Sequence, residues 1–244
     1  YFNNDVVYAY ENLLPGAFKA DLWRYCVLYI LGGIYYDIPM EPLVAMRDII
    51  DHNDELVITR DTPSKKYYLY NAFMASTPKH PVLLIAINMI VTNVKNKWYG
   101  DVCDSLTITG PGLLGRAVNK LLSRYEYMEY TLGTSIINNY RINVIEHSPG
   151  FLSKGNQKIL NTKYNGYHQD RQRLAGTHYS TLYMERAVYC EYIFDRTGLN
   201  RDMSFLIPNN IYQTFCTKCI SKNISNSSQS WKDNNTKFNY YLNT

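Results

Sequence analysis

The chain lacks the features that mark membrane-spanning, secreted and nucleic-acid-binding proteins. No apolar stretch reaches the length of a transmembrane helix, and no signal peptide is visible. Lysine and arginine are scattered rather than clustered, and the formal net charge is only +4. Because basic blocks are the usual sign of nucleic-acid binding, no nucleic-acid partner is expected. We therefore expect a cytoplasmic protein without a membrane span.

Cysteine is also sparse. The five cysteines are an odd number without secretory context, which favours free thiols over disulfides. Cys216 and Cys219 form a C-x-x-C pair, but no second pair stands at the spacing of a zinc site. The turn at 109–112, Thr-Gly-Pro-Gly, is not followed by the Gly-Lys-Ser/Thr of a P-loop. Zinc-finger and P-loop classes are thereby excluded.

What is present is an ordinary globular composition with one excess. Hydrophobic residues make up 46% of the 244 residues and charged residues 19%, as expected of a single α/β domain spanning 1–244. Tyrosine occurs 24 times. Tyrosine rings suit carbohydrate sites, but frequent Asn, Ile and Lys beside them indicate the composition of an AT-rich genome. We prefer the compositional explanation for most of these tyrosines.

The most informative segment runs from residue 17 to residue 43. Its first part, 17–31, has apolar residues at helical spacing on both faces, which predicts a helix buried on most sides. Asp21 and Arg24 lie three residues apart on that helix and are therefore neighbours on its surface. They form either a buried ion pair that braces the helix or a polar clamp that faces a cleft.

The residues after this helix favour the clamp. Gly32 and Gly33 can end a helix, and 34–36, Ile-Tyr-Tyr, has the composition of a strand. That strand ends at Asp37, and Pro39 prevents further ladder pairing. An acidic residue at the carboxyl end of a strand in an α/β protein lies where ligands usually bind.

This arrangement resembles the DXD-containing sugar transferases of glycosyltransferase family 32 and its viral and bacterial relatives. Their pattern is A-D-x-x-R-Y followed by L-Y-x-x-G-G-I-Y-x-D-x-D. The matching residues are Ala20, Asp21, Arg24, Tyr25, Leu28, Tyr29, Gly32, Gly33, Ile34, Tyr35 and Asp37. Because so many positions match at fixed spacing, the signal is more specific than a lone D-x-D.

The resemblance implies a divalent cation, Mn²⁺ or Mg²⁺, held by paired carboxylates against the diphosphate of a nucleotide-sugar. The second acidic position of the motif is Pro39 here. With one carboxylate missing, we expect weaker metal binding or a compensating ligand beside Asp37. His178 is the first candidate, because family members often end with a His near the metal, although a lone His is usually structural. Glu41 is the alternative, and for it we prefer a surface position.

The resemblance also assigns roles to individual residues. Asp37 would hold the metal-bound diphosphate, and Asp21 and Arg24 would hydrogen-bond the hydroxyls of the donor sugar. The residues expected to contact the rest of the nucleotide-sugar are Tyr36, Asn71, Tyr212 and Gln213. For Asn71, capping of the strand entry is an equally weighted alternative.

The order of the chain departs from the family. The segment 207–215, I-P-N-N-I-Y-Q-T-F, resembles the first strand of the family domain, and 230–242 resembles its next strand. We therefore expect 203–244 to correspond to the amino-terminal strand-helix-strand unit and 1–200 to the remainder. The order would be circularly permuted, derived from tandem copies, or numbered out of covalent order.

Other segments complete the expected fold. Strands are predicted at 56–59 and 71–76, helices at 82–97 and 113–122, and a β-rich stretch at 136–163. Together with the resemblance, they indicate a GT-A-type, Rossmann-like α/β domain with a mostly parallel central sheet. Residues 109–112 match a family segment near the acceptor side.

The expected function is transfer of a hexose from a nucleotide-sugar to a glycan or protein acceptor, with retention implied by the family. Two alternatives remain. One is a transferase-like protein that only binds glycan or nucleotide after losing its metal chemistry at Pro39. The other is a glycoside hydrolase that uses two carboxylates such as Asp37 and Glu41. A viral protein would act in the host cytoplasm, and the Golgi lumen is kept as an alternative compartment.

Overall fold

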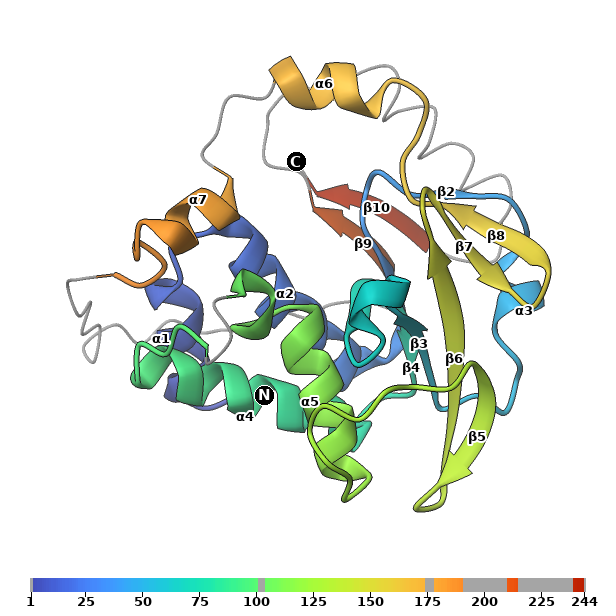
Figure 1. Ribbon diagram of the computed structural model, residues 1–244, viewed down its shortest axis with the longest axis horizontal. Helices are drawn as coiled ribbons and strands as arrows, with labels where there is room; N and C mark the ends of the chain where they lie inside the picture. Colours follow the sequence, from blue (N-terminus) through green and yellow to red (C-terminus); the bar gives the residue numbers. More distant parts are fainter. Residues whose placement is uncertain (1, 101–103, 174–177, 191–209, 215–238, 244) are drawn as a thin grey trace.

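The longer helices gather on one side of a curled β-sheet in the computed structural model, which describes residues 2–100, 104–173, 178–190, 210–214 and 239–243 (Figure 1). This group comprises α1 (Asn4–Asn12), α2 (Gly16–Leu31), α4 (Pro81–Lys95) and α5 (Pro111–Leu121). The shorter helices are α3 (Met46–Ile49), η1 (Pro63–Lys65), η2 (Ser105–Thr107), α6 (Tyr167–Arg173) and α7 (Tyr179–Met184). Among the described residues, no helix combines the length and the hydropathy that crossing a membrane requires.

The main sheet has the strand order β1-β4-β3-β6-β7-β8-β2, with β5 paired to β6 outside this path. The strands are β1 (Gly33–Tyr36), β2 (Glu41–Pro42), β3 (Leu56–Arg60), β4 (Leu69–Ser76), β5 (Gly133–Ile137), β6 (Tyr140–Ser148), β7 (Phe151–Lys154) and β8 (Gln157–Asn161). Within the described sheet, β3 and β6 pair in parallel and the other pairs are antiparallel. The α/β class is confirmed, while parallel pairing holds only in part.

The join between α2 and β1 has the form that the sequence predicts. Helix α2 ends at Leu31, and Gly32 caps it with a φ of 65° while its N–H donates to the Leu28 carbonyl at 2.8 Å. A Cβ at Gly32 would lie 2.7 Å from the Pro78 ring and 2.8 Å from the Ser76 carbonyl oxygen. Both backbone conformation and space therefore require glycine at this position.

Two hydrophobic clusters occupy the two faces of the sheet. Tyr35 and Met74 belong to the cluster under the helices, whereas their neighbours Tyr36 and Phe73 belong to the cluster on the other face. This alternation is the period of two that a strand imposes on its side chains. The predicted core stripe of α4 is confirmed, since Leu83, Ala86, Ile87, Ile90 and Val94 are all buried.

The segment around Ile211 forms a strand, as predicted. Strand β9 (Asn210–Thr214) pairs in parallel with β10 (Asn239–Asn243), and β9 contacts β1. Residues 203–209, 215–238 and 244 lie outside the described residues, so the permuted order stays a prediction. Cys103, Cys216 and Cys219 also lie outside them, and the two described cysteines, Cys26 and Cys190, are free thiols.

A buried histidine gives the first testable prediction. His80 precedes α4, is 3% exposed, and neither ring nitrogen has a hydrogen-bond partner among the described residues. Burial lowers its pKa from 6.5 to about 4, against a smaller opposing effect of Glu55. Between these values the unfolded chain binds more protons than the folded one, so stability falls as the pH falls through this window.

The difference in free energy of unfolding between His80→Phe and the wild type should shift by about 2 kcal/mol in favour of the variant when the pH is lowered from 7.5 to 5. Urea unfolding at both pH values measures this difference, and His52→Phe on an exposed turn is the matched control. If His80→Phe changed the free energy of unfolding equally at both pH values, the claim that the His80 imidazole is buried in its neutral form would be contradicted.

Candidate functional site

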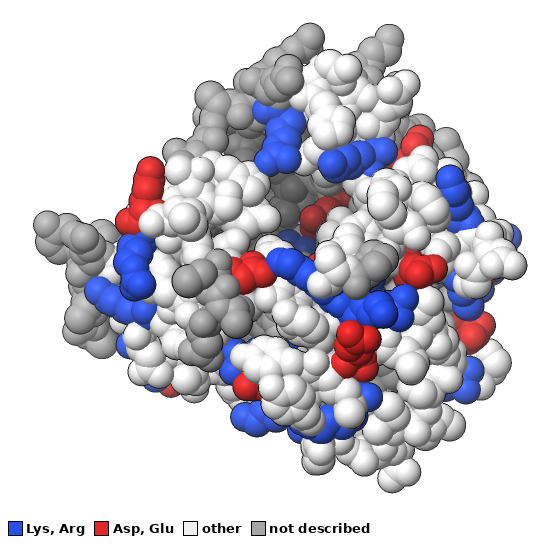
Figure 2. Space-filling view, in the orientation of Figure 1, with Lys and Arg blue, Asp and Glu red and all other residues white. Residues whose placement is uncertain are grey.

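A cavity of about 260 Å³ opens where α2 meets the ends of several strands. Its walls include six polar side chains: Asp21, Arg24, Asp37, Asp61, Tyr70 and Asn71. The wall also includes Ser105 at the start of η2, Pro111 at the start of α5 and Tyr179 at the start of α7. Figure 2 shows this face of the molecule hollowed near its centre, with acidic side chains inside the hollow and Lys or Arg side chains along its edge.

Strand direction explains why the acidic residues meet there. Strands β1 and β3 are both antiparallel to β4, and β6 is parallel to β3, so β1, β3 and β6 run the same way. Asp37 follows β1, Asp61 follows β3, and His147 lies near the end of β6. Carboxyl ends of strands that run in one direction share an edge of the sheet, which is the usual ligand-binding edge.

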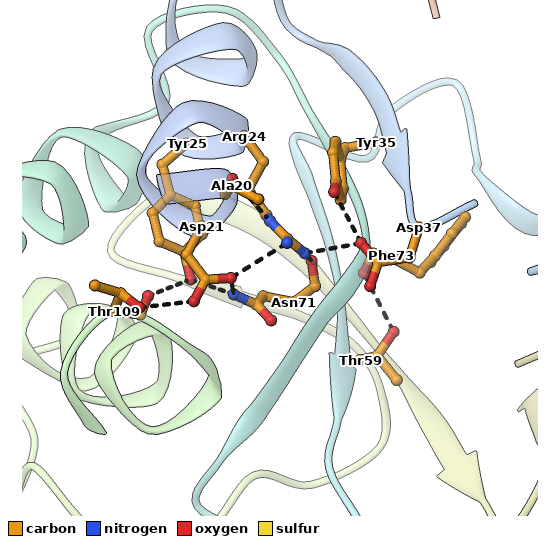
Figure 3. A network of polar contacts seen from close by, with 10 residues as sticks. All are labelled: Ala20, Asp21, Arg24, Tyr25, Tyr35, Asp37, Thr59, Asn71, Phe73 and Thr109. Carbon is orange, nitrogen blue, oxygen red and sulfur yellow. Dashed lines mark hydrogen bonds and ion pairs between the residues drawn. The ribbon is translucent and has the colours of Figure 1, made fainter. Parts of the chain in front are cut away.

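Arg24 is the centre of the polar network (Figure 3). One terminal nitrogen, Nη1, donates to the Asn71 carbonyl at 2.8 Å and to Asp37 Oδ1 at 3.1 Å. The other, Nη2, lies 3.3 Å from Asp21 Oδ1. The guanidinium also lies over the Tyr35 ring, 4.4 Å from its centroid. These contacts fix a buried cation between two carboxylates from different elements.

The charge of Arg24 is secure in this setting. Burial alone would favour the neutral form, but Tyr35, Asp37 and Asp21 outweigh it, so the pKa of the Arg24 guanidinium is raised. The side chain is only 6% exposed. Both the charge and the position of the guanidinium are therefore fixed at the cavity wall.

Asp21 uses both of its oxygens inside the protein. Oδ2 accepts from the Thr109 hydroxyl at 2.7 Å, and Oδ1 accepts from Asn71 Nδ2 at 2.8 Å. Burial raises the pKa of Asp21, while Arg24, Thr109 and Asn71 act against that rise. Asp21 and Arg24 therefore do not pair only with each other: both line the cavity, and both join α2 to other elements.

Asp37 is more open than Asp21. Oδ1 accepts from Arg24 and from the Tyr35 hydroxyl at 2.8 Å, whereas Oδ2 accepts no hydrogen bond from the described residues. The side chain is 37% exposed. After Asp37 the chain turns, with the Met40 N–H donating to the Asp37 carbonyl at 3.0 Å, and Pro39 lies inside that turn. Asp37 thus offers one carboxylate oxygen to the cavity.

Asn71 lies within β4 rather than at its entry. Besides its bond to Asp21, its Nδ2 donates to the Tyr25 hydroxyl at 2.8 Å, and the residue is 5% exposed. These bonds tie β4 to α2 and do not cap the strand. The side-chain oxygen of Asn71 accepts no hydrogen bond from the described residues.

The other candidate residues lie outside this network. Tyr36 is fully buried in the cluster on the opposite face of the sheet and does not line the cavity. His178 is exposed and immediately precedes α7, where its Nδ1 accepts from the Ser180 N–H at 3.3 Å. His178 does not line the cavity. Glu41 lies in β2 and accepts from Asn161 Nδ2 at 3.2 Å. The side chains of Tyr212 and Gln213 lie outside the described residues.

Sequence reasoning missed Asp61 and Tyr70. Asp61 is 8% exposed, and its Oδ1 accepts from the Thr62 N–H at 2.7 Å and lies 3.3 Å from His147 Nδ1. The Tyr70 ring stacks on His147 with centroids 4.3 Å apart. The missed signal was an acidic residue directly after a buried strand, the pattern that singled out Asp37.

The first quarter of the chain matches a known family. Residues 2–56 match the family model of a glycosyltransferase sugar-binding region containing a DXD motif. The chain carries a glycosyltransferase-like sugar-binding region. The matched segment includes Asp21, Arg24 and Asp37. The same three residues line the cavity. Asn71 and Asp61 lie beyond the matched segment.

Among solved structures, the chain is similar to the PaToxG glycosyltransferase. The sequence identity is 20% and the TM-score 0.34, and the match covers 44% of this chain and 36% of that chain. The chain thus spans about a third of the length of this neighbour. A comparison with curated protein sequences gives no match.

The donor set fits a hard divalent cation only partly. Among the described residues, no group of three or more His, Cys, Asp or Glu side chains is arranged to hold a metal ion. Asp37 nevertheless lines the cavity, and carboxylate oxygens suit Mg²⁺ and Mn²⁺. A cation that takes further oxygens from a substrate diphosphate needs only one or two protein carboxylates.

Proposed function

We propose that this chain transfers a hexose from a nucleotide-sugar to a glycan or protein acceptor. One observation carries the proposal: three residues of the matched sugar-binding segment, Asp21, Arg24 and Asp37, converge on one cavity, where the two carboxylates pair with the buried guanidinium. A diphosphate is the anionic part of a nucleotide-sugar. Because Asp21, Asp37 and Asp61 also line the cavity, a diphosphate bound there needs a cation in addition to Arg24.

The rate of transfer would come from fixed electrostatics rather than from a strong nucleophile. The bond to the sugar breaks as negative charge develops on the departing diphosphate, so prepositioned positive charge lowers the barrier. Arg24 is held by four neighbours and needs little reorganisation at that moment. Asp21 and Asn71 hold Arg24 and the sugar-facing wall, while Asp37 binds the donor directly.

A divalent cation completes this proposal by neutralising charge on the diphosphate. Asp37 is its proposed carboxylate ligand. Because Pro39 supplies no charge, the cation and the donor should bind together, each raising the affinity of the other. Tyr212 and Gln213 are proposed to contact the nucleotide, and the contact of β9 with β1 supports this proposal.

Membership of family 32, retention at the anomeric carbon and a viral origin belong to the same proposal and rest on the motif resemblance. Pro39 gives one specific reason to consider a second function, the binding of a glycan or nucleotide without turnover. A hydrolase that uses Asp37 and Glu41 is less favoured, because Glu41 contacts Asn161 and does not line the cavity.

Product analysis separates these functions. The protein is incubated with UDP-, GDP- and TDP-hexoses and Mn²⁺, with and without a mixture of glycan and peptide acceptors. Transfer predicts glycosylated acceptor together with an equal amount of nucleoside diphosphate. Binding without turnover predicts neither product. Hydrolysis of glycans without any use of the nucleotide-sugar would overturn the proposal.

A further inference from the structure

We propose that Tyr70 recognises the hexose of the donor, its hydroxyl donating a hydrogen bond to one hydroxyl group of that sugar. The inference rests on the proposed function, because it assigns a role within the same cavity. Tyr70 lies outside the matched segment 2–56, so the family match gives it no role. His147 is the residue that positions the Tyr70 ring.

Tyr70 and its neighbour Asn71 line the cavity from the two faces of β4. The Asn71 side chain bonds to α2 through Asp21 and Tyr25, whereas the Tyr70 side chain packs against the hydrophobic cluster on the opposite face of the sheet. Consecutive residues of a strand point to opposite faces in this way. A ligand in the cavity therefore meets Tyr70 from a side that Asn71 does not reach.

The Tyr70 ring is held in place by a neighbour that is itself held. The ring of His147 stacks on it, with centroids 4.3 Å apart and ring planes 20° from parallel. Nδ1 of His147 lies 3.3 Å from Asp61 Oδ1, which also accepts from the Thr62 N–H. The side chains of His147 and Asp61 are 13% and 10% exposed. A ring fixed before binding loses little conformational freedom when a ligand arrives.

The Tyr70 hydroxyl is a neutral donor without a partner among the described residues. It is not one of the polar atoms that the described fold encloses without a hydrogen bond, so water or a ligand in the cavity can reach it. Burial raises the pKa of this hydroxyl, and the charges of Asp37 and Asp61 raise it further, against a smaller effect of Arg24. The phenol therefore keeps its proton at neutral pH and remains able to donate.

The nearby donors of the cavity are already engaged. The Arg24 guanidinium donates to two backbone carbonyls and pairs with two carboxylates, and Asn71 Nδ2 donates to both Asp21 and Tyr25. Three carboxylates line the same cavity. A phosphate oxygen only accepts, whereas a sugar hydroxyl donates to a carboxylate and accepts from a phenol. The group that best suits the surroundings of Tyr70 is therefore the hexose.

Binding of nucleotides with and without the sugar tests the inference. Calorimetry compares UDP-, GDP- and TDP-hexoses with UDP, GDP and TDP, and the measured quantity is the gain in affinity that the hexose provides. Tyr70→Phe keeps the ring and removes only the hydroxyl, so this gain should fall about 3- to 10-fold while binding of the nucleoside diphosphate stays unchanged. Tyr125→Phe, at a residue that is 71% exposed, is the matched control and should change neither.

Two variants of His147 test its positioning role. His147→Ala removes the stacked ring and should lose the same hexose-dependent gain, although Tyr70 keeps its hydroxyl. His147→Phe restores an aromatic ring and should recover most of that gain. Wild-type hexose-dependent gain in folded His147→Ala would overturn the positioning role.

Deoxy-hexose donors, each lacking one hydroxyl group, identify the contact. One of them should bind the wild type and Tyr70→Phe equally well. Equal binding of every deoxy-hexose and its parent by the wild type would overturn the inference even if Tyr70→Phe did not fold.

The outcomes separate this inference from the proposed function. If Tyr70→Phe weakened UDP and UDP-hexose by the same factor, or weakened neither, the role of Tyr70 would be overturned and the transferase proposal would stand. Failure of the wild type to bind any of the nucleotide-sugars would overturn both.

Discussion

Arg24→Ala should reduce sugar transfer by a factor of about 10² to 10³, the loss typical when one preorganised donor to developing charge is removed. The same change should lower the free energy of unfolding by about 3–5 kcal/mol, because it leaves the buried Asp21 without its counter-charge. Arg24 also connects α2 to β4 through the Asn71 carbonyl, so that backbone group loses its partner too. Initial-rate assays and urea unfolding measure the two effects.

Two further variants distinguish charge from packing. Arg47→Ala removes an exposed arginine outside the network and should change neither quantity. Arg24→Lys keeps the charge but cannot reach all four acceptors of the guanidinium at once, so it should recover more stability than rate. Full transfer activity in folded Arg24→Ala would contradict a catalytic role for the guanidinium.

Gly115→Ala should be the most destabilising single-methyl change in the described core. A Cβ at Gly115 would fall far inside van der Waals distance of the Tyr67 carbonyl oxygen, which belongs to the backbone and cannot swing away. Overpacking of this kind costs about 1–3 kcal/mol or more. Helix α5 would be displaced from β4, and with it Pro111, which lines the cavity. Reduced donor binding should therefore accompany the loss of stability.

Gly16→Ala is the matched control for this prediction. Gly16 begins α2, and a Cβ there meets nothing within 4 Å. Replacing a helical glycine by alanine at an unstrained position should stabilise the fold by up to about 1 kcal/mol. Thermal unfolding of the two variants should therefore move in opposite directions. A similar shift in both would show that α5 can adjust to an added methyl group.

Local patterns carried most of the sequence prediction. The helix that contains Asp21, its glycine end and the strand before Asp37 depend on neighbours within a few residues, and all three elements are confirmed. The core stripe of α4 has the same local origin. Spacing alone also placed Asp21 beside Arg24, because residues three apart on a helix must be neighbours.

Long-range pairing accounts for what the sequence did not reveal. The antiparallel pairings of β1 and β3 with β4 bring Asp61 to the edge that Asp37 occupies, and no local pattern encodes that pairing. The face of the sheet on which each side chain of β1 lies also depends on long-range packing. Tyr35 faces Arg24 and Tyr36 faces the opposite cluster, and only the position of α2 decides which tyrosine meets the site.

The parallel content of the sheet was the least accurate expectation. The resemblance implied a mostly parallel sheet, but residues 136–163 form β5 to β8 as successive antiparallel neighbours. Short connections such as the turn between β7 and β8 permit only antiparallel pairing. Strands β1, β3 and β6 nevertheless run in one direction, whereas β4, which carries Tyr70 and Asn71, runs the opposite way.

Donor binding tests the central claim, that the cavity around Arg24 is a nucleotide-sugar site. Calorimetric titration of UDP-, GDP- and TDP-hexoses, with Mn²⁺, into the wild type and Asp37→Asn measures it directly. We predict that one nucleotide class binds to the wild type, that Mn²⁺ strengthens this binding, and that Asp37→Asn weakens it. Absence of binding for every nucleotide-sugar, or equal binding by Asp37→Asn, would contradict the claim.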